Sequence, residues 1–168
     1  KRLAQRGYFL GANRVLLSPQ ATHRVVDRGV AVHDWSWREW LAAWGRREVN
    51  RLLPLLTLPD AGFRTWTPGR WKGIKTCNLS LWRDDLLRVN GLDESYEGWG
   101  LEDTDLVIRL LRTGVKHKSA RYAAPVFHLW HREQPRSGLE ENQRRLNRVV
   151  GSQDTRAAKG LDRYGVSL

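Results

Sequence analysis

The chain has 168 residues, of which 40 % are hydrophobic and 28 % charged, a balance typical of a globular protein rather than a disordered one. Its formal net charge of +11 favours a negatively charged partner: nucleic acid, an anionic membrane surface or a phosphorylated substrate. No apolar run approaches the roughly 20 residues of a membrane-spanning helix, and the single cysteine, Cys77, excludes an internal disulfide and favours a reducing compartment.

The first part of the chain is predicted to form a strand and then a helix. An apolar run over residues 8–17 is typical of a buried strand. Ser18 then matches a helix N-cap and Pro19 the first helical position, and Gly29 is typical of the residue that ends a helix. We therefore expect a short helix between Ser18 and Gly29.

Residues 35–56 form a basic segment rich in tryptophan. From Trp37 onward the apolar side chains recur at helical spacing, at Trp40, Leu41 and Trp44. Four arginines accompany them: Arg38, Arg46, Arg47 and Arg51. A basic amphipathic helix with tryptophan is typical of contact with an anionic membrane surface, so one hypothesis is peripheral attachment to the inner face of the cell membrane. The alternative is a helix that packs its tryptophans on its own domain.

The middle of the chain is predicted to contain a loop, two strands and two helices. Prolines and glycines over 57–72 predict an irregular loop. Residues 73–81 are typical of a strand, 84–90 of a helix closed by glycine, and 103–112 of an acidic amphipathic helix that also ends at glycine. A short strand is expected over 122–129.

The C-terminal part is predicted to be helical at first and then irregular. Ser137 and Glu140 have the spacing of a capping box, which predicts a helix that extends to Val150. Residues 151–168 are polar and weakly patterned, so we expect a mobile tail there.

The start of the acidic helix is the most informative feature of the sequence. Gly98 and Gly100 let the backbone come close to a ligand, and Trp99 between them offers a flat apolar face on which a sugar can stack. Glu102 and Asp103 follow at the helix start, where unpaired N–H groups and the helix dipole favour an ionised carboxylate. Such a carboxylate can accept a proton from a bound hydroxyl. The alternative is an ordinary acidic helix start beside a core tryptophan.

Asp105 is expected to have a different role. It lies about 200° around the helix from Asp103, so the two carboxylates do not point into one pocket. Because Asp105 precedes Arg109 by four residues, we predict an exposed ion pair on the helix surface and a structural role.

Two histidines, His128 and His131, suggest a metal site. Imidazole is a common ligand of divalent metals. On a strand, however, an offset of three places the side chains on opposite faces, so both bind one ion only if the chain turns between them. One metal ligand from this pair is the simpler prediction, and the alternative is a core histidine followed by a surface histidine.

Five motifs follow one another along the chain. They are Gly73-Ile74-Lys75-Thr76-Cys77-Asn78-Leu79-Ser80, Arg83-Asp84-Asp85, Val89-Asn90-Gly91-Leu92-Asp93, Gly-Trp-Gly-x-Glu-Asp-x-Asp over 98–105, and Val126-Phe127-His128-Leu129-Trp130-His131. In this order they resemble the second half of a GT-A glycosyltransferase. The chain is similar to family 2 glycosyltransferases whose C-terminal region matches that of the β-1,4-galactosyltransferases, and the similarity is densest over 73–131.

The resemblance implies an α/β fold of the GT-A nucleotide-sugar type, with a mixed sheet flanked by helices, of which residues 1–150 are the acceptor and metal side. It implies an inverting transfer from a nucleotide-diphosphate sugar to a saccharide or glycolipid acceptor, as in bacterial polysaccharide or glycolipid synthesis. By the resemblance, Asp103 is the general base, and Trp99, Glu102, Gly98 and Gly100 form the acceptor site. His131 binds Mn²⁺ or Mg²⁺, and His128 is the second candidate ligand.

The sequence lacks the other half of that pattern. Nothing in it matches the nucleotide-binding unit or the Asp-x-Asp motif of such enzymes, so we expect both to precede Lys1 and this chain alone to be inactive. The alternative function is a catalytically inactive basic domain that binds nucleic acid or an anionic membrane. Arginines interleaved with tryptophans around Trp40 favour it, whereas the Glu102–Asp103 pair does not. For the enzyme we expect a cytoplasmic location.

Overall fold

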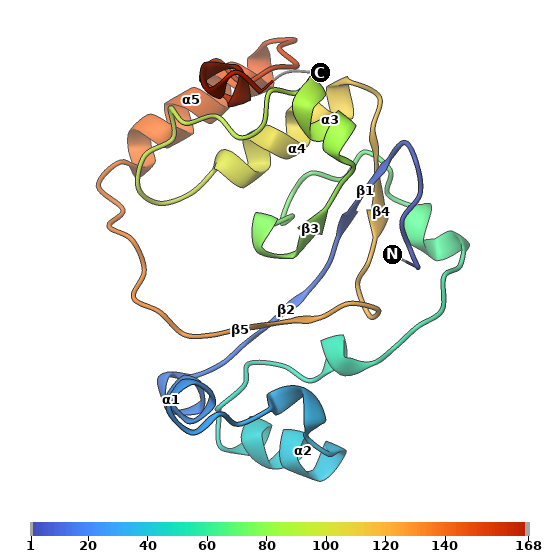
Figure 1. Ribbon diagram of the computed structural model, residues 1–168, viewed down its shortest axis with the longest axis vertical. Coiled ribbons are helices and arrows are strands. Elements are labelled where there is room, and N and C mark those ends of the chain that lie inside the picture. Colours follow the sequence, from blue (N-terminus) through green and yellow to red (C-terminus); the bar gives the residue numbers. More distant parts are fainter. Residues whose placement is uncertain (1, 167–168) are drawn as a thin grey trace. The chain divides into compact units, whose positions relative to one another are not determined.

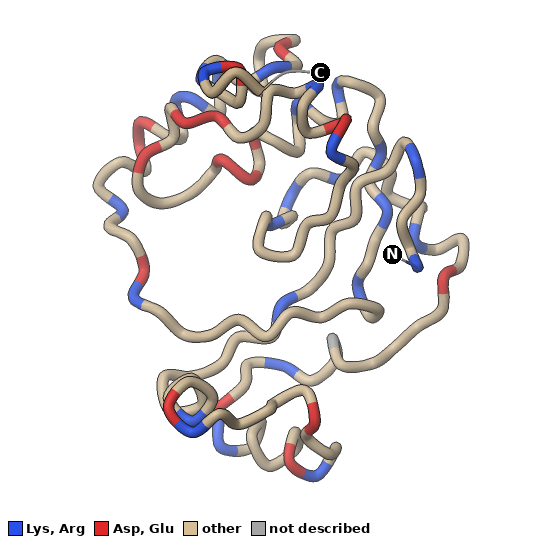
Figure 2. The backbone as a smooth tube through the Cα atoms, viewed as in Figure 1, with Lys and Arg blue, Asp and Glu red and all other residues tan. Residues whose placement is uncertain are grey.

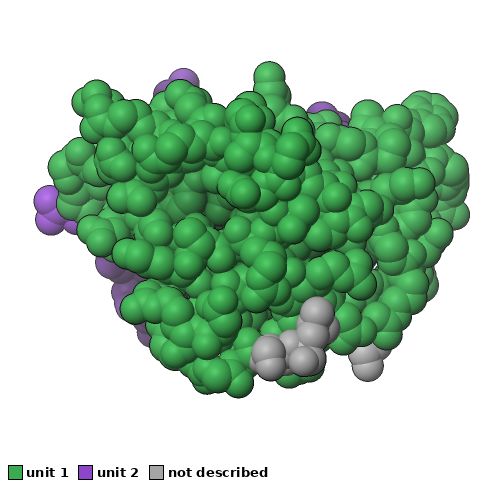
Figure 3. Space-filling model, turned by 90° about the horizontal axis from the view of Figure 1, so that it is seen from above, with its two compact units in different colours: residues 1–11, 60–119, 133–168 green, residues 12–59, 120–132 purple. Residues whose placement is uncertain are grey.

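A computed structural model of the chain describes residues 2–166. By its internal contacts the chain divides into two compact units, which Figure 3 shows in separate colours. Unit 1 comprises residues 1–11, 60–119 and 133–168, and unit 2 comprises residues 12–59 and 120–132. Each unit has its own small sheet and its own apolar core. No helix in the described part of the chain is long and apolar enough to cross a membrane.

Unit 1 contains a mixed sheet of three strands in the order β3-β1-β4 (Figure 1). The central strand β1 (Tyr8–Gly11) runs antiparallel to β3 (Leu79–Ser80) and parallel to β4 (Lys116–Ser119). In the β1–β4 register Phe9 lies opposite His117. The prediction of a mixed sheet flanked by helices is confirmed.

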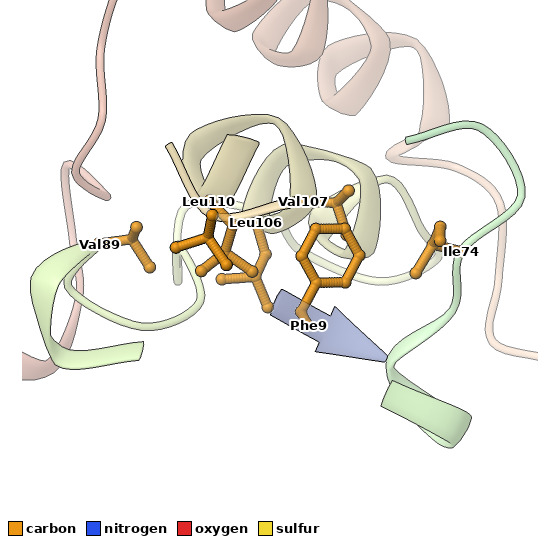
Figure 4. Close-up of a cluster of buried hydrophobic side chains, with 7 residues drawn as sticks. Phe9, Ile74, Val89, Leu106, Val107 and Leu110 are labelled. Carbon is orange, nitrogen blue, oxygen red and sulfur yellow. The ribbon is translucent and has the colours of Figure 1, made fainter. Parts of the chain in front are cut away.

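The helices of unit 1 are α3 (Arg83–Arg88), α4 (Glu102–Arg112) and α5 (Leu139–Gly151). Helix α4 is the centre of the core: its apolar face forms one buried cluster with Phe9 of β1 (Figure 4). Burial of each such side chain contributes about 1.5–3 kcal/mol. Because α4 is packed into this cluster, the position of its N-terminal turn within unit 1 is fixed. The cluster consists of Phe9, Ile74, Val89, Leu106, Val107, Leu110 and Val115.

Unit 2 is built on two parallel strands, β2 (Arg14–Leu16) and β5 (Val126–His128), with helices α1 (Pro19–Arg28) and α2 (Trp37–Gly45). Its core is partly aromatic, because Trp40 stacks on Phe127 with ring centroids 5.2 Å apart. Short 3₁₀ turns complete the two units: Val32–Asp34, Leu53–Leu55, Gly62–Thr65, Thr76–Asn78 and Leu161–Tyr164.

The strands differ from the prediction in four places. The apolar run 8–17 is interrupted at residues 12–13, and its halves β1 and β2 pair in different sheets because each finds its partner strand in a different unit. The predicted strand 73–81 is reduced to Leu79–Ser80, and that over 122–129 to Val126–His128. Strand β4 was missed because its sequence is polar, although it buries His117 and Lys118.

The predicted helix ends are mostly confirmed. Ser18 Oγ accepts a hydrogen bond from the Ala21 N–H, and Gly29 adopts a left-handed conformation with φ 63°. The capping box predicted at Ser137 is wrong, because α5 begins after Gly138 without a side-chain cap. A capping box instead starts α2, where the Ser36 and Glu39 side chains each accept from the other's backbone N–H.

The described part of the C-terminal segment, residues 152–166, contacts the rest of unit 1. Asn90 is 1 % exposed and donates to the Ala157 carbonyl, while its own side-chain oxygen accepts from the Asp162 N–H. Asp93 accepts from the Ala158 N–H. These contacts were not expected of a segment predicted to be mobile, and its mobility in solution stays a prediction.

A buried carboxylate in unit 2 makes its stability dependent on pH. Glu48 is 8 % exposed and binds Arg24 through two hydrogen bonds of 2.9 and 2.7 Å and Arg46 through one of 2.9 Å. The hydrogen bonds from Arg46 first, and Arg24 second, lower the pKa of Glu48 from its usual 4.5. Ionised Glu48 therefore stabilises the fold above that value, and its contribution is lost as the pH falls through the lowered pKa.

We expect Glu48→Gln to lower the urea midpoint of unfolding at neutral pH, because it removes the stabilising charge. The midpoint of the unaltered chain should then decrease more steeply in acid than that of the variant, until the two converge. Urea titrations followed by circular dichroism across the acidic range provide the measurement. A gap between the two midpoints that is the same at every pH would contradict this role of Glu48.

Candidate functional site

The loop that leads into α4 has a backbone that few residue types adopt. Gly98, Gly100 and Leu101 all have positive φ, at 73°, 82° and 84°. Glycine adopts this conformation without cost, whereas a leucine there costs roughly 1–3 kcal/mol. The two glycines are therefore needed for the shape of the loop, which turns the chain sharply before the helix begins.

One side chain from α5 holds this loop in place. Asn142 is 2 % exposed, and its Nδ2 lies 2.9 Å from the carbonyl oxygen of Glu97 and 3.3 Å from those of Trp99 and Gly100. Asn142 thus supplies a partner for three backbone carbonyls of the irregular loop. Sequence reasoning missed Asn142, because only its position on the inner face of α5 distinguishes it from other polar residues.

Asp103 is buried and held at both carboxylate oxygens. Its side chain lies in the first turn of α4 with 7 % exposure; Oδ1 accepts a 2.8 Å hydrogen bond from the Thr76 N–H. Oδ2 lies 3.7 Å from the Lys75 ammonium. These contacts and the N-terminal end of the α4 dipole orient a negatively charged group. Lys75 and Thr76 belong to the motif over residues 73–80, so the sequence already pointed to this segment.

Glu102 and Trp99 lie beside Asp103 in sequence and are only half-buried. The guanidinium of Arg136 stacks over the Trp99 ring, with 4.6 Å between its central carbon and the ring centroid. Pro135 also approaches the loop, since a Cβ added at Gly98 would meet its carbonyl oxygen at 3.4 Å. Arg136 therefore covers one face of the Trp99 ring, and the role of this ring as a platform for a sugar stays a prediction.

Asp105 forms the predicted pair with Arg109, but the pair is buried rather than exposed. Both side chains are 1 % exposed, and the shortest contact between them is 3.0 Å. Arg109 also donates to the carbonyls of Val89 and Gly91. Burial raises the pKa of Asp105, and Arg109 opposes that shift. The structural role agrees with the sequence prediction; the expected exposure was wrong, because α3 and its following turn cover this face of α4.

In unit 2 the structure brings His128 and His131 together. Strand β5 ends at His128, and the chain turns immediately, so an offset of three no longer separates the two side chains. Their Nε2 atoms lie 3.2 Å apart. The turn is anchored to α1, because the Trp130 N–H donates a 2.7 Å hydrogen bond to the buried hydroxyl of Thr22. The sequence-based choice of a single ligand did not foresee this convergence.

The hydrogen positions of the pair follow from its contacts. His131 Nδ1 lies 3.1 Å from the carbonyl oxygen of Arg132, which can only accept, so Nδ1 carries the hydrogen and Nε2 accepts the 3.2 Å hydrogen bond from the Nε2–H of His128. Binding of one cation by both Nε2 atoms would require His128 to carry its hydrogen on Nδ1 instead. Burial first, and the nearby positive charge of Arg14 second, lower the pKa of His128. A lowered pKa favours the neutral imidazole, which is the form that binds a metal.

The distance between the two nitrogens fits a shared cation. Two imidazole nitrogens that each lie about 2.1 Å from one ion are roughly 3.0–3.4 Å apart at common coordination angles. The described residues contain no group of three or more histidine, cysteine or acidic side chains that could hold a metal. That the pair binds a metal therefore stays a prediction.

The predicted residues thus form two groups, one in each unit. Gly98, Trp99, Gly100, Glu102 and Asp103 belong to the start of α4 in unit 1. His128 and His131 belong to the end of β5 in unit 2.

The chain is similar to known sugar-transferring proteins over part of its length. Residues 61–132 match the protein family described as "N-terminal domain of galactosyltransferase". Chondroitin sulfate synthase 3 of Homo sapiens and that of Mus musculus are each 32 % identical to this chain over 63 residues. This similarity covers 38 % of the chain and 7 % of each synthase, so the chain spans only a small part of these relatives. No solved structure matches the chain.

The family match contains all seven predicted site residues, because it extends beyond both the α4 loop and the histidine pair. Residues 61–132 are therefore a glycosyltransferase-like segment. Arg136 and Asn142, which contact the α4 loop, lie outside the matched segment.

Proposed function

We propose that this chain is the acceptor side of an inverting, metal-dependent glycosyltransferase of the GT-A type. It would transfer a sugar from a nucleotide-diphosphate donor to a hydroxyl of a saccharide or glycolipid, in the cytoplasm of a bacterium that builds polysaccharide or glycolipid. The observation that supports the proposal most is Asp103, a buried and oriented carboxylate inside the glycosyltransferase-like segment.

In the proposed reaction Asp103 is the general base. It accepts the proton of the acceptor hydroxyl while that oxygen forms a bond to the anomeric carbon of the donor sugar. The bond from the anomeric carbon to the diphosphate breaks, and its electron pair leaves with the nucleoside diphosphate. A single in-line displacement of this kind inverts the anomeric carbon.

The other residues of the α4 loop would position the acceptor. The half-buried ring of Trp99 would stack on the sugar, and Glu102 can accept hydrogen bonds from sugar hydroxyls. Because Asn142 holds the loop backbone, the acceptor would meet a preformed surface.

His128 and His131 would hold the metal ion, Mn²⁺ or Mg²⁺. The ion, when bound, supplies positive charge that stabilises the leaving diphosphate. Both imidazoles present Nε2 to the same point, which supports the assignment of the pair rather than of one histidine.

The experiment is a Mn²⁺ titration of the natural full-length protein. Release of nucleoside diphosphate from a panel of sugar nucleotides measures turnover, and water-proton relaxation measures Mn²⁺ binding without any substrate. We expect His131→Ala to raise the half-saturating Mn²⁺ concentration by roughly 10–100-fold or more. Loss of a residue that only supports a metal ligand already lowers metal affinity by that factor. His23→Ala, which alters an exposed histidine of α1, is the matched control and should leave it unchanged.

Two results would overturn parts of this proposal separately. Equal Mn²⁺ binding by His131→Ala and by the unaltered protein would remove the metal role of the pair. No release of nucleoside diphosphate from any sugar nucleotide, by protein that binds Mn²⁺, would overturn the transferase.

A further inference from the structure

Helix α2 presents large apolar side chains to the outside as well as to the core. Trp40 is 5 % exposed and Ala43 fully buried, so these two side chains pack inside unit 2. Trp37, Leu41 and Trp44 are 52 %, 53 % and 53 % exposed. Their spacing of four and three residues places all three on one stripe of the helix. Only one of the three tryptophans of α2 is thus needed by the core of unit 2.

Positive charge accompanies this outer stripe. Arg38 lies on α2 itself, and Arg47 and Arg51 follow it within six residues of the helix end. None of these three arginines forms an ion pair with an acidic side chain in the described part of the chain, whereas the neighbouring Arg46 is engaged by Glu48. Lys and Arg occur along the whole backbone (Figure 2), so positive charge alone does not single out α2. What distinguishes α2 is the combination of arginines with exposed tryptophans.

A hollow adjoins the end of the stripe. Its volume is about 460 Å³, and it is lined by Trp44, Gly45, Arg47, Val49 and Asn50. Arg47 has a φ of 57°, so the chain turns sharply at the rim of the hollow. An aromatic ring, a guanidinium and an amide around one open hollow match the glycerol and phosphate of an anionic lipid headgroup.

We infer that the outer stripe of α2 docks on the surface of an anionic lipid bilayer. Trp37, Leu41 and Trp44 enter the boundary between headgroups and acyl chains, and Arg38, Arg47 and Arg51 contact lipid phosphates. Tryptophan favours this boundary because its ring is apolar and its N–H can still meet a polar partner. The inference goes beyond the proposed function and does not depend on it.

Charge selects the bilayer over a second copy of the chain. Two copies that met through this stripe would place arginines against arginines, and each copy carries a net charge of +11. An anionic leaflet instead attracts each arginine near its surface with about 1 kcal/mol, or roughly fivefold in affinity.

The test is cosedimentation of the chain with vesicles. Vesicles of phosphatidylcholine with 30 % phosphatidylglycerol should bind the chain, and vesicles of pure phosphatidylcholine should bind it at least tenfold more weakly. The triple variant Trp37→Ser, Leu41→Ser, Trp44→Ser keeps the net charge, and we expect it to lose at least tenfold in affinity for the anionic vesicles. The double variant Arg38→Gln, Arg47→Gln should bind the anionic vesicles roughly 25-fold more weakly, because each arginine contributes roughly fivefold in affinity.

Matched controls distinguish binding through this surface from nonspecific binding to the vesicles. Trp66→Ser removes another exposed tryptophan, and Arg70→Gln with Arg83→Gln removes two exposed arginines of unit 1; both proteins should bind like the unaltered chain. Circular dichroism should show the same fold for all variants, since every altered side chain is exposed.

Three results would overturn the inference. They are undiminished binding of the triple variant, an equal loss in the control variants, and sedimentation of the unaltered chain as a dimer that the triple variant abolishes. Binding to a single-stranded oligonucleotide that the triple variant loses, without any vesicle binding, would assign the surface to nucleic acid instead.

Discussion

Asp103→Asn is expected to lower the kcat of the natural full-length protein by about 10²–10⁴, the usual contribution of a positioned general base. Asparagine keeps the shape of the side chain, and its Oδ1 can still accept from the Thr76 N–H, so the geometry of the loop is retained. It cannot take the proton of the acceptor hydroxyl. Steady-state kinetics with varied donor and acceptor should show a fall in kcat with donor binding nearly unchanged.

Glu102→Gln is the matched comparison, because it makes the same chemical change at the next residue. We expect it to raise the KM for the acceptor and to leave kcat within a small factor, since Glu102 is assigned to acceptor binding. A folded Asp103→Asn protein with undiminished kcat would disprove the base assignment. A fall in kcat in Glu102→Gln alone would transfer that role to Glu102.

The second large effect is expected on stability rather than on catalysis. Asp105→Asn leaves the guanidinium of Arg109, which is 1 % exposed, without its counter-charge. Breaking a buried ion pair from one side costs about 3–5 kcal/mol of unfolding free energy. Because a domain has only about 5–15 kcal/mol in total, this variant should unfold at a much lower urea concentration than the unaltered chain.

Two further variants test the cause of that loss. Asp105→Leu combined with Arg109→Met removes both charges, and we expect it to be more stable than Asp105→Asn because no charge is left uncompensated. Glu140→Gln breaks an exposed pair with Arg144 on α5 and should shift the urea midpoint very little. A shift in Asp105→Asn as small as that in Glu140→Gln would show that the buried pair contributes no more than a surface pair.

The sequence predicted best those features that depend on neighbouring residues. The N-cap at Ser18 and the left-handed Gly29 follow from hydrogen bonds within one helical turn. The start of α4 was predicted within one residue. Glycines, then carboxylates, then apolar residues at helical spacing follow one another within a few residues, and this local order marks a helix start. The sharp turn before α4 could be predicted in the same way, from Gly98 and Gly100.

The strands were predicted less well, since a strand depends on its partners. The polar strand β4 has no hydrophobic signal, and it exists because it pairs with β1. The capping-box spacing at Ser137 was misleading for a related reason: the chain before α5 lies against the α4 loop, where a Cβ at Gly138 would meet the Glu97 carbonyl at 3.1 Å. The helix therefore begins one residue later, and the Ser137 side chain makes no cap.

By itself, the sequence determined the helices, the caps of α1, the composition of the α4 loop and the resemblance to a glycosyltransferase. Only the tertiary structure decided that Asp105 and Arg109 are buried and that Asn142 holds the α4 loop. It also placed Thr76 and Lys75 at the carboxylate of Asp103. In unit 2 it brought the Nε2 atoms of the two histidines together. It also decided that Trp40 faces the core while Trp37 and Trp44 face outward. The physical reason is the same in each case. Burial and side-chain partners come from segments distant in sequence, and local propensity carries no information about which of them will meet.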